Sequence, residues 1–241
     1  MQRVLRKRVL RDLGHNFFRY FALGLLIAMG IFLVVTIVGN GETLSRGTVD
    51  MAEETNLEDG EFEVFVPLSS KDKEGIFEMG IDIEEQFYFD YQMSAEEDGT
   101  VRLFKVRKNI NKIHYIEGNA PTDGTELVVE KRYAEEHDLS VGSTFEKKKK
   151  SYKVSGIGVV SDYDGPYKEI SDASCNSKNF GLIFITDEAY EEFGKSGNAQ
   201  KSETYLYSYK LGNGRTDKEL KDYLKDLKIE STQVDDDLFQ E

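Results

Sequence analysis

One long apolar stretch near the start of the chain differs from every other segment. No charged residue lies between Arg19 and Glu42, and the side chains of residues 20–38 are almost all apolar. A bilayer core needs about 20 such residues in helical form, because backbone groups in lipid must pair within their own segment. A cleaved secretory signal has a shorter apolar run of about 7–15 residues and a small-residue cleavage site, which residues 38–41 do not provide. The pattern predicts an uncleaved transmembrane helix over residues 17–41.

Beyond this stretch the chain changes to short patterned segments. Residues 42–60 are polar without strong periodicity, and we interpret them as a helical or irregular stalk. Alternating runs predict strands at 61–66, 81–93, 101–106, 109–116, 126–130, 144–148, 151–160, 181–185 and 203–211, with a turn at 97–99 and a hairpin tip at 147–150. Capped periodic runs predict helices at 71–79, 132–138, 186–193 and 216–227. Because these elements mix without a regular βαβ rhythm, we expect residues 61–241 to form an α+β domain.

One glycine carries a sharp local prediction. Leu139-Ser-Val-Gly142 follows the predicted short helix and leads into the next strand. Glycine tolerates the left-handed backbone region that β-branched residues avoid. We therefore expect Gly142 to occupy a turn with positive φ.

The first residues carry a second pattern, which combines charge with periodicity. On a helical wheel the apolar side chains of Leu5, Val9, Leu10, Leu13 and Phe17 share one side, and the basic side chains of Arg3, Lys7, Arg8 and Arg11 share the other. This indicates a basic amphipathic helix over residues 1–16 on the inner leaflet. The alternative is a general positive topology signal without such a helix.

Charge also predicts the orientation. Residues 1–19 hold six basic residues and one acidic residue, whereas the whole chain has 31 basic and 45 acidic residues and a net charge of -14. Basic flanks stay in the cytoplasm. We therefore expect a single-pass chain in the cell membrane, with a cytoplasmic N-terminus and residues 42–241 extracytoplasmic. The acidic exterior argues against nucleic acid, which binds basic surfaces.

Composition indicates a folded exterior. Hydrophobic residues at 39% and aromatic residues at 12% argue against disorder. About 200 residues can form one sizeable core or two small lobes. The single Cys175 cannot form an intrachain disulfide, so stability must come from packing.

Candidate chemical residues are few. His15, His114 and His137 are far apart in sequence, and a zinc site needs several converging ligands, so we interpret His137 and its acidic neighbours as a solvated helix face. Cys175 lies in a polar segment without a neighbouring histidine, and there is no G-x-S-x-G elbow. We therefore expect no catalytic or metal-binding residue and no enzyme.

Two further segments contain residues that occur in binding motifs. Ser161-Asp-Tyr-Asp-Gly165 lacks the spacing of a calcium loop and is interpreted as a turn. The lysines at 147–150 could touch anionic lipid heads or wall polymers, but the simpler interpretation is a solvated hairpin tip that blocks edge pairing. No P-loop pattern is present, so the chain is expected to bind no cofactor, and any ATP hydrolysis must come from a partner.

Residues 116–160 carry the most specific pattern in the chain. Gly118 and Pro121 precede a predicted strand at residues 126–130 and a short helix that contains Ala134. The motif Leu-x-Val-Gly follows at residues 139–142, then a strand pair that ends in Val-x-Gly-Ile within residues 152–157. This resembles the extracytoplasmic core domain of MacB-like, FtsX-type permease subunits of ABC transporters. Residues 184–190 and the first helix, residues 7–38, are similar to the same family.

The resemblance implies a partner and a mechanism. Such subunits work with a cytoplasmic ABC ATPase, contact membrane lipid and can pair with a second permease copy, and ATP-driven movement of their helices reshapes the outer domain. They also carry at least three more spanning helices after this domain, and no such run follows Val38 in this sequence. We therefore interpret the chain as a permease subunit or the N-terminal fragment of one. The alternative is a single-span anchored ectodomain that binds a ligand or cell-wall component without transport.

Overall fold

The computed structural model describes residues 14–92, 99–147, 150–163, 165, 167–168, 174–195, 203–229 and 239–240, with no account of the side chains at 41–45, 145–147, 150, 228–229 and 239–240. The chain divides into two compact units, Met1–Asp50 and Met51–Glu241. The predicted amphipathic helix, residues 1–16, lies almost entirely outside the described residues.

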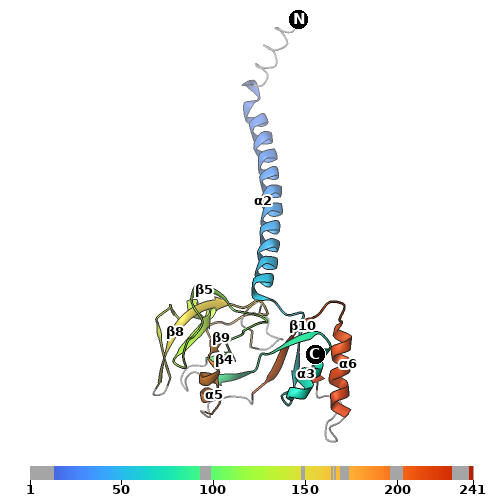
Figure 1. The fold of residues 1–241 in the computed structure, drawn as a ribbon. Helices are drawn as coiled ribbons and strands as arrows, with labels where there is room; N and C mark the ends of the chain where they lie inside the picture. Colours follow the sequence, from blue (N-terminus) through green and yellow to red (C-terminus); the bar gives the residue numbers. More distant parts are fainter. Residues whose placement is uncertain are drawn as a thin grey trace. The chain divides into compact units, whose positions relative to one another are not determined.

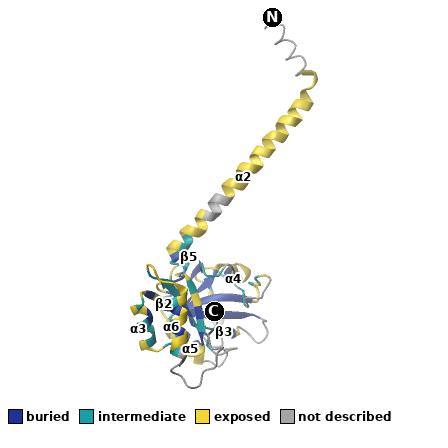
Figure 2. Cartoon of the chain, turned by 90° about the vertical axis from the view of Figure 1, so that its right-hand side faces the viewer, coloured by how far each residue is buried: buried dark blue, intermediate teal, exposed yellow. Residues whose placement is uncertain are grey.

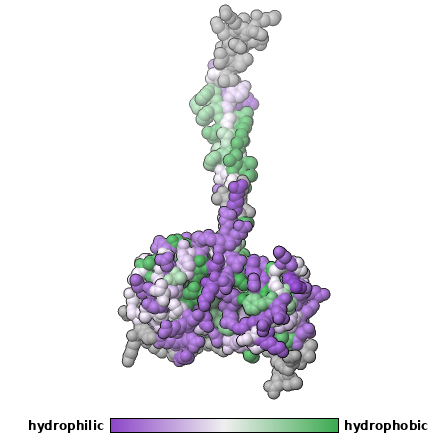
Figure 3. All heavy atoms as spheres, viewed as in Figure 1, coloured by the Kyte–Doolittle hydropathy of each residue, from purple (hydrophilic) through white to green (hydrophobic). Residues whose placement is uncertain are grey.

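Helix α2 (Phe17–Thr55) dominates the first unit. Its stretch Phe17–Asn40 is the one helix among the described residues that is long and apolar enough to cross a membrane. All of its described side chains are exposed in the structure, and they form a hydrophobic band (Figures 2 and 3). This helix fits a membrane-anchored protein with a folded domain.

The predicted stalk is helical over most of its length, because α2 continues to Thr55. Asn56 then takes φ 52°, and the N–H of Leu57 donates to the carbonyl of Ala52 at 2.8 Å. These are features of a Schellman ending, in which asparagine tolerates the left-handed conformation. The domain boundaries at 41/42 and 60/61 stay predictions.

A four-stranded antiparallel sheet forms the first part of the domain. Its elements follow the chain order β1 (Gly60–Val64), α3 (Ser70–Glu78), β2 (Ile81–Glu85), β10 (Tyr205–Leu211), α6 (Asp217–Ile229) and β11 (Phe239–Gln240). The spatial order is β11-β1-β10-β2, so α3 and α6 each follow a strand in a split βαβ arrangement (Figure 1). This sheet places β2 at an edge.

A seven-stranded mixed sheet is inserted between β2 and β10. Its strands are β3 (Tyr88–Gln92), β4 (Thr100–Lys105), β5 (His114–Gly118), β6 (Glu126–Glu130), β7 (Thr144–Lys147), β8 (Lys150–Val159) and β9 (Phe180–Ile185). The order is β3-β4-β9-β6-β8-β5, with β7 also paired to β8. The pairs β4–β9 and β6–β8 are parallel and the others antiparallel. Two helices complete this part, α4 (Lys131–Glu136) and α5 (Asp187–Lys195).

The two sheets share one main core. Buried apolar side chains of β1, β2, β10, α3 and α6 form one cluster with those of β3, α4 and α5. A second cluster lies on the other face of the seven-stranded sheet and includes Phe104, Val128, Leu182 and Phe184. Burial of apolar area at about 25 cal/mol per Å² makes these clusters the main source of stability.

The α+β class and most predicted elements are confirmed. The predicted strand 81–93 is wrong as one element: it divides at Gln86 and Phe87 into β2 and β3, which belong to different sheets, because the chain crosses between sheets there. The predicted strand 109–116 is correct only at its end, where β5 begins at His114, because an irregular segment with Asn111 at φ 53° precedes it. Strand β11 was not predicted. The predicted turn 97–99 and hairpin tip 147–150 fall largely outside the described residues.

Candidate functional site

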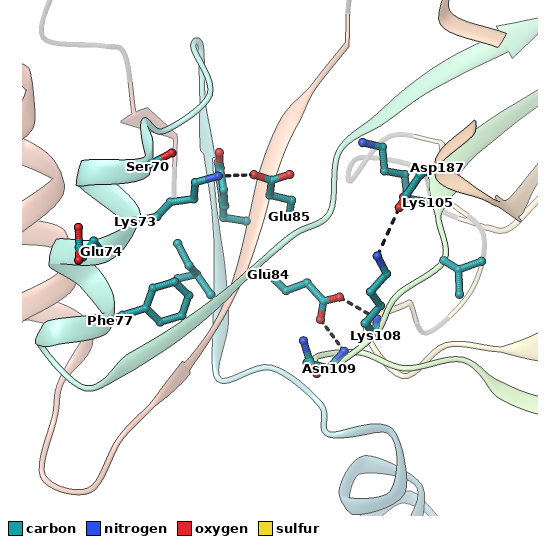
Figure 4. A pocket seen from close by; sticks show the side chains of 13 residues that line it. Ser70, Lys73, Glu74, Phe77, Glu84, Glu85, Lys105, Lys108, Asn109 and Asp187 are labelled. Carbon is teal, nitrogen blue, oxygen red and sulfur yellow. Dashed lines mark hydrogen bonds and ion pairs between the residues drawn. The ribbon is translucent and has the colours of Figure 1, made fainter. Parts of the chain in front are cut away.

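A groove of about 640 Å³ runs along β2 between α3 and the segment that follows β4 (Figure 4). Its lining residues are Ser70, Lys73, Glu74, Phe77, Ile83, Glu84, Glu85, Lys105, Val106, Lys108, Asn109, Asp187 and Tyr207. They come from both sheets, so the groove is a feature of the junction between the two parts of the domain. More than half of these residues are charged, and Phe77, Ile83 and Val106 are apolar.

Helix α3 forms one wall and is fixed by its N-cap. The Ser69 hydroxyl accepts from the Asp72 N–H, and the Asp72 carboxylate accepts from the Ser69 N–H at 3.0 Å. This capping box starts the helix at Ser70. On the groove side, Lys73 pairs with Glu85 at 2.8 Å, and Phe77 is 48% exposed. The wall thus offers an apolar ring beside a paired charge.

The opposite wall carries two lysines. The Lys108 ammonium lies 3.3 Å from the Asp187 carboxylate, and both side chains are more than half exposed. The Lys105 ammonium lies 5.0 Å from the centre of the Tyr190 ring, a cation–π distance. This wall is the more basic side of the groove.

Glu84 fastens this wall to β2. Its carboxylate accepts from the backbone N–H groups of Lys108 at 2.7 Å, Asn109 at 2.9 Å and Ile110 at 2.5 Å. Successive N–H groups around one anion form a nest, and such charge-assisted bonds are stronger than neutral ones. Glu84 therefore joins the four-stranded sheet to the segment that leads into the seven-stranded sheet.

Among the described residues, two arginines are buried, one in β4 and one shortly after it. Arg102 of β4 donates to Asp90 of β3 at 2.8 Å and 3.2 Å, and its guanidinium lies 4.2 Å from the centre of the Tyr88 ring. Burial alone would lower the pKa of Arg102, but the hydrogen bond that Arg102 donates to Asp90 and nearby charges raise it overall. Burial raises the pKa of Tyr163, which accepts from Arg102, to about 12. The Arg102–Asp90 pair joins the two neighbouring strands β3 and β4 through their side chains.

Arg107 is the second buried arginine. It pairs with Asp162 at 2.5 Å and lies about equally close to two rings, at 5.0 Å from Phe104 and 5.3 Å from Phe184. Its Nε and Nη2 atoms are buried without a hydrogen-bond partner among the described residues. Asp162, predicted as part of a turn, lies in one, and it also serves as the counter-ion of a buried cation.

The last turn of α2 is bonded to the segment between Arg107 and β5. The N–H of Asn111 donates to Asn56 O at 3.1 Å, and the N–H of Lys112 donates to Thr55 O at 2.8 Å. In return the Asn56 side chain donates to Asn109 O at 2.8 Å. Residues 55–56 and 109–112 thus form a joint, which we call the α2 joint.

Asn111 is the centre of the α2 joint. It is fully buried, its Oδ1 accepts from the Glu58 N–H at 2.9 Å, and its Nδ2 donates to Glu58 at 2.7 Å and Ser208 at 3.1 Å. Its positive φ explains why asparagine stands here, since this residue tolerates the left-handed region. One side chain therefore links the chain leaving α2 to β10.

Acidic groups gather beside the α2 joint. Burial raises the pKa of Glu58, although hydrogen bonds from Ser208 and Asn111 oppose the change. Burial, together with the charges of Glu58 and Asp162, raises the pKa of Glu61 to about 7. We therefore expect the stability of this part of the domain to change with pH.

The candidate residues from the sequence do not converge. His114 lies 3.0 Å from Glu54, and His137 Nε2 lies 3.1 Å from Lys178 O and packs on Tyr133. His15 belongs to the other unit. Cys175 is free and half-buried, with Arg132 Nη1 3.6 Å away. No group of three metal-ligating side chains occurs among the described residues. Lysines 148 and 149 are outside them, as is Asp164.

Sequence reasoning missed Glu84 and Asn111. Glu84 is one of several acidic residues in an alternating run, and nothing local marks the carboxylate that meets three N–H groups. Asn111 offered a weak signal, because the sequence Asn109-Ile-Asn111 is unusual for the strand that was predicted there.

No protein-family model and no curated protein matches the chain. Among solved structures, the chain is similar to the periplasmic region of MacB from Actinobacillus actinomycetemcomitans, with 7% identity over 71% of this chain and 83% of that chain and a TM-score of 0.39. It is also similar to a domain of a putative permease protein from Porphyromonas gingivalis, with 13% identity over 74% of this chain and 87% of that chain and a TM-score of 0.39.

Proposed function

We propose that the chain is the membrane-anchored, extracytoplasmic part of an ABC-transporter permease, either as a subunit or as the N-terminal part of one. Its task is to couple ATP hydrolysis by a cytoplasmic partner to the outer domain. The observation that carries the proposal is the α2 joint, in which the end of the membrane-spanning helix is hydrogen-bonded to the connection between the two sheets.

The joint supports coupling because its segment also contacts both sheets. Asn109 and Ile110 donate to Glu84 of β2, and Asn111 donates to Ser208 of β10. On the other side Arg107 holds Asp162 and lies against rings of β4 and β9. A displacement of the last turn of α2 would therefore act on both sheets and on the groove between them. Packed elements that respond together transmit motion of this kind.

The proposed orientation rests on the charge pattern of the sequence, and the proposed partners rest on the family resemblance. The basic side chains among residues 1–16 favour a cytoplasmic N-terminus held to anionic lipid, at about 1 kcal/mol per basic side chain near the surface. The partner is an ABC ATPase on that side, and a second permease copy completes the complex. The sequence contains no P-loop pattern, so the proposal assigns ATP hydrolysis to the partner.

The test compares ATP turnover with an intact and a weakened joint. The full gene product is purified from its host membrane with its co-purifying ATPase, and ATP turnover is measured in nanodiscs. Asn111→Ala removes the side chain at the centre of the joint and should change ATP turnover. Asn109→Ala is the matched control, since the joint uses only its backbone groups. Absence of any co-purifying nucleotide-binding subunit, or equal turnover in all three forms, contradicts the proposal.

A second function has its own support. The groove of about 640 Å³ is large enough for a ligand, which favours a single-span anchored ectodomain that binds a ligand or cell-wall component without transport. Binding of wall polymers by the purified chain, without a co-purifying ATPase, would support this second function.

A further inference from the structure

The outer edge of β2 is open in the part of the domain that the structure describes. β2 is the last strand in the order β11-β1-β10-β2. The N–H of Gly212 donates to Gly80 O at 2.9 Å, and the N–H of Gln86 donates to Leu206 O at 2.8 Å. Bonded positions alternate along an antiparallel pair. The even-numbered residues of β2 therefore bond β10, whereas Ile81, Ile83 and Glu85 direct their N–H and C=O groups outward.

This open edge lies in the groove. Ile83, Glu84 and Glu85 all line the groove, with α3 on one side and the segment after β4 on the other (Figure 4). No described strand pairs with the outer side of β2. An extended backbone laid in the groove can therefore reach the outward N–H and C=O groups.

The charges of β2 do not block this edge. Natural proteins protect exposed edges with short strands and charged side chains. Here the Glu84 carboxylate is bound by three backbone N–H groups, and Glu85 pairs with Lys73. Both carboxylates are thus partly neutralised by groups of the domain, and each is held to one side of the strand.

We propose that β2 receives an extended segment of a partner protein as an additional strand, and that this segment alternates apolar and acidic side chains. Strand addition of this kind takes affinity from backbone hydrogen bonds and specificity from the alternating side chains. Side chains of an added strand point alternately to the two faces of the sheet. Each wall of the groove therefore contacts every second side chain of the segment, and we call these two sets its apolar half and its acidic half.

The α3 wall selects the apolar half. Phe77 is 48% exposed and lies beside Ile83 and Tyr207 in the groove lining. Glu74 on the same helix also lines the groove, so an acidic side chain would be repelled on this face. Apolar side chains gain by covering the Phe77 ring.

The wall after β4 selects the acidic half. Lys105 has no carboxylate partner among the described residues and rests on the Tyr190 ring. Lys108 is held only by an exposed pair with Asp187, and such pairs contribute little. Acidic side chains on this face would complement both lysines and speed association.

Strand addition needs neither ATP nor an ATPase partner, so the proposal goes beyond the transport function and can fail or succeed separately. The probe is a fluorescent peptide of five Val-Glu repeats with blocked ends. Its anisotropy is measured with the full chain in nanodiscs. Three control peptides are a Val block joined to a Glu block, five Val-Lys repeats, and the Val-Glu peptide with alternate backbone nitrogens methylated. We expect saturable binding of the Val-Glu peptide and at least about tenfold weaker binding of each control, as loss of strand hydrogen bonds or charge complementarity predicts.

Variants of the chain locate the site. Ile83→Pro removes an outward N–H at an edge, where proline is tolerated, and should weaken binding about tenfold, whereas Ile83→Val keeps the N–H and should bind as the parent does. Lys105→Glu should weaken binding, and Lys218→Glu, which makes the same charge change on exposed α6, should not. Circular dichroism checks that each variant folds.

Three outcomes would overturn the proposal. The methylated peptide would bind the parent chain as well as the unmethylated one, a result that does not depend on any variant folding. Alternatively, folded Ile83→Pro would bind like Ile83→Val. Finally, a concentration-dependent dimer that excludes the peptide would show that the edge pairs with a second copy of the chain instead.

Discussion

The central strands β4, β9 and β6 of the seven-stranded sheet are buried on both faces, whereas most residues of β1 and β2 in the four-stranded sheet are not buried. All six residues of β9 are buried, as are four of the five in β6. In β2 only Ile81 is buried, and in β1 only Phe62 and Val64. A sheet covered on both faces has near-continuous apolar strands, and a sheet covered on one face has alternating strands.

The two most buried of the described ion pairs lie in the seven-stranded part. Arg102–Asp90 and Arg107–Asp162 in the seven-stranded sheet have side chains that are less than 10% exposed, whereas Lys73–Glu85 at the four-stranded sheet is about one-third exposed. Buried pairs fix geometry, because breaking one leaves an uncompensated charge. The seven-stranded sheet thus serves as scaffold, and the four-stranded sheet presents the open edge and the groove.

The largest expected effect breaks a buried pair of the scaffold. Arg102→Leu leaves Asp90 buried without its partner and should lower the free energy of unfolding by about 3–5 kcal/mol. Lys73→Met at the groove removes an exposed pair and should cost less than about 1 kcal/mol. Urea unfolding of both variants, followed by near-ultraviolet circular dichroism, gives the comparison.

A double variant provides the control for this prediction. Arg102→Leu combined with Asp90→Leu removes both charges and should recover most of the lost stability, as replacement of buried pairs by apolar side chains does elsewhere. If Arg102→Leu and Lys73→Met cost the same, the division into scaffold and surface fails.

Substitution of a turn glycine should lower stability by a smaller amount, and by the same amount in the seven-stranded and the four-stranded parts of the domain. Gly142, between α4 and β7, has φ +92°, and Gly214, between β10 and α6, has φ +80°; a Cβ at either would meet no atom within 4 Å. Valine at either position should cost about 1–3 kcal/mol through backbone strain alone. Asparagine, which tolerates positive φ, should cost less at both sites. Melting temperatures of the four variants test this, and a loss at only one glycine would show that local packing governs the cost.

The positive φ of Gly142 shows how far local sequence reaches. The turn, the strand 126–130 and the helix starts were predictable because caps, glycines and alternating runs act over a few residues. The division of residues 81–93 was not, because Gln86 and Phe87 continue the apolar–polar pattern while the chain passes to another sheet. Pairing between sheets depends on contacts far apart in sequence, which periodicity does not encode.

The residue types of the candidate site were predictable from the sequence, but their arrangement was not. The sequence supplies lysines, carboxylates and a half-exposed phenylalanine, but the groove exists because β2 and β10, about 120 residues apart, pair and leave one edge open. Likewise Asn111 and Asn56 meet only after the whole domain folds. Membrane anchorage was predictable because a long apolar run is a local signal.

The smallest effect distinguishes the two parts by the sign of their pH dependence. The pKa of Glu61 in β1 is raised from 4.5 to about 7 by burial and neighbouring carboxylates, whereas hydrogen bonds from Thr122 lower the pKa of Glu126 at the start of β6. A raised pKa means that the folded state holds its proton longer, so the contribution of Glu61 to stability is full below pH 4.5 and is lost as pH rises to about 7. The contribution of Glu126 is present above its unfolded pKa and is lost as pH falls through the folded one.

Replacing Glu61 or Glu126 by glutamine should remove that residue's contribution to the change of unfolding free energy with pH. Glu61→Gln should flatten the decline in unfolding free energy between pH 4.5 and about 7, by less than about 1 kcal/mol because the side chain remains partly exposed to screening solvent. Glu126→Gln should leave that window unchanged and reduce the loss at acid pH. Unfolding curves collected across pH 3–8 for the parent chain and both variants measure the two slopes. If both variants change the unfolding free energy over the same pH range and in the same direction, Glu61 and Glu126 do not act separately. The two parts of the domain then do not differ in the sign of their pH dependence.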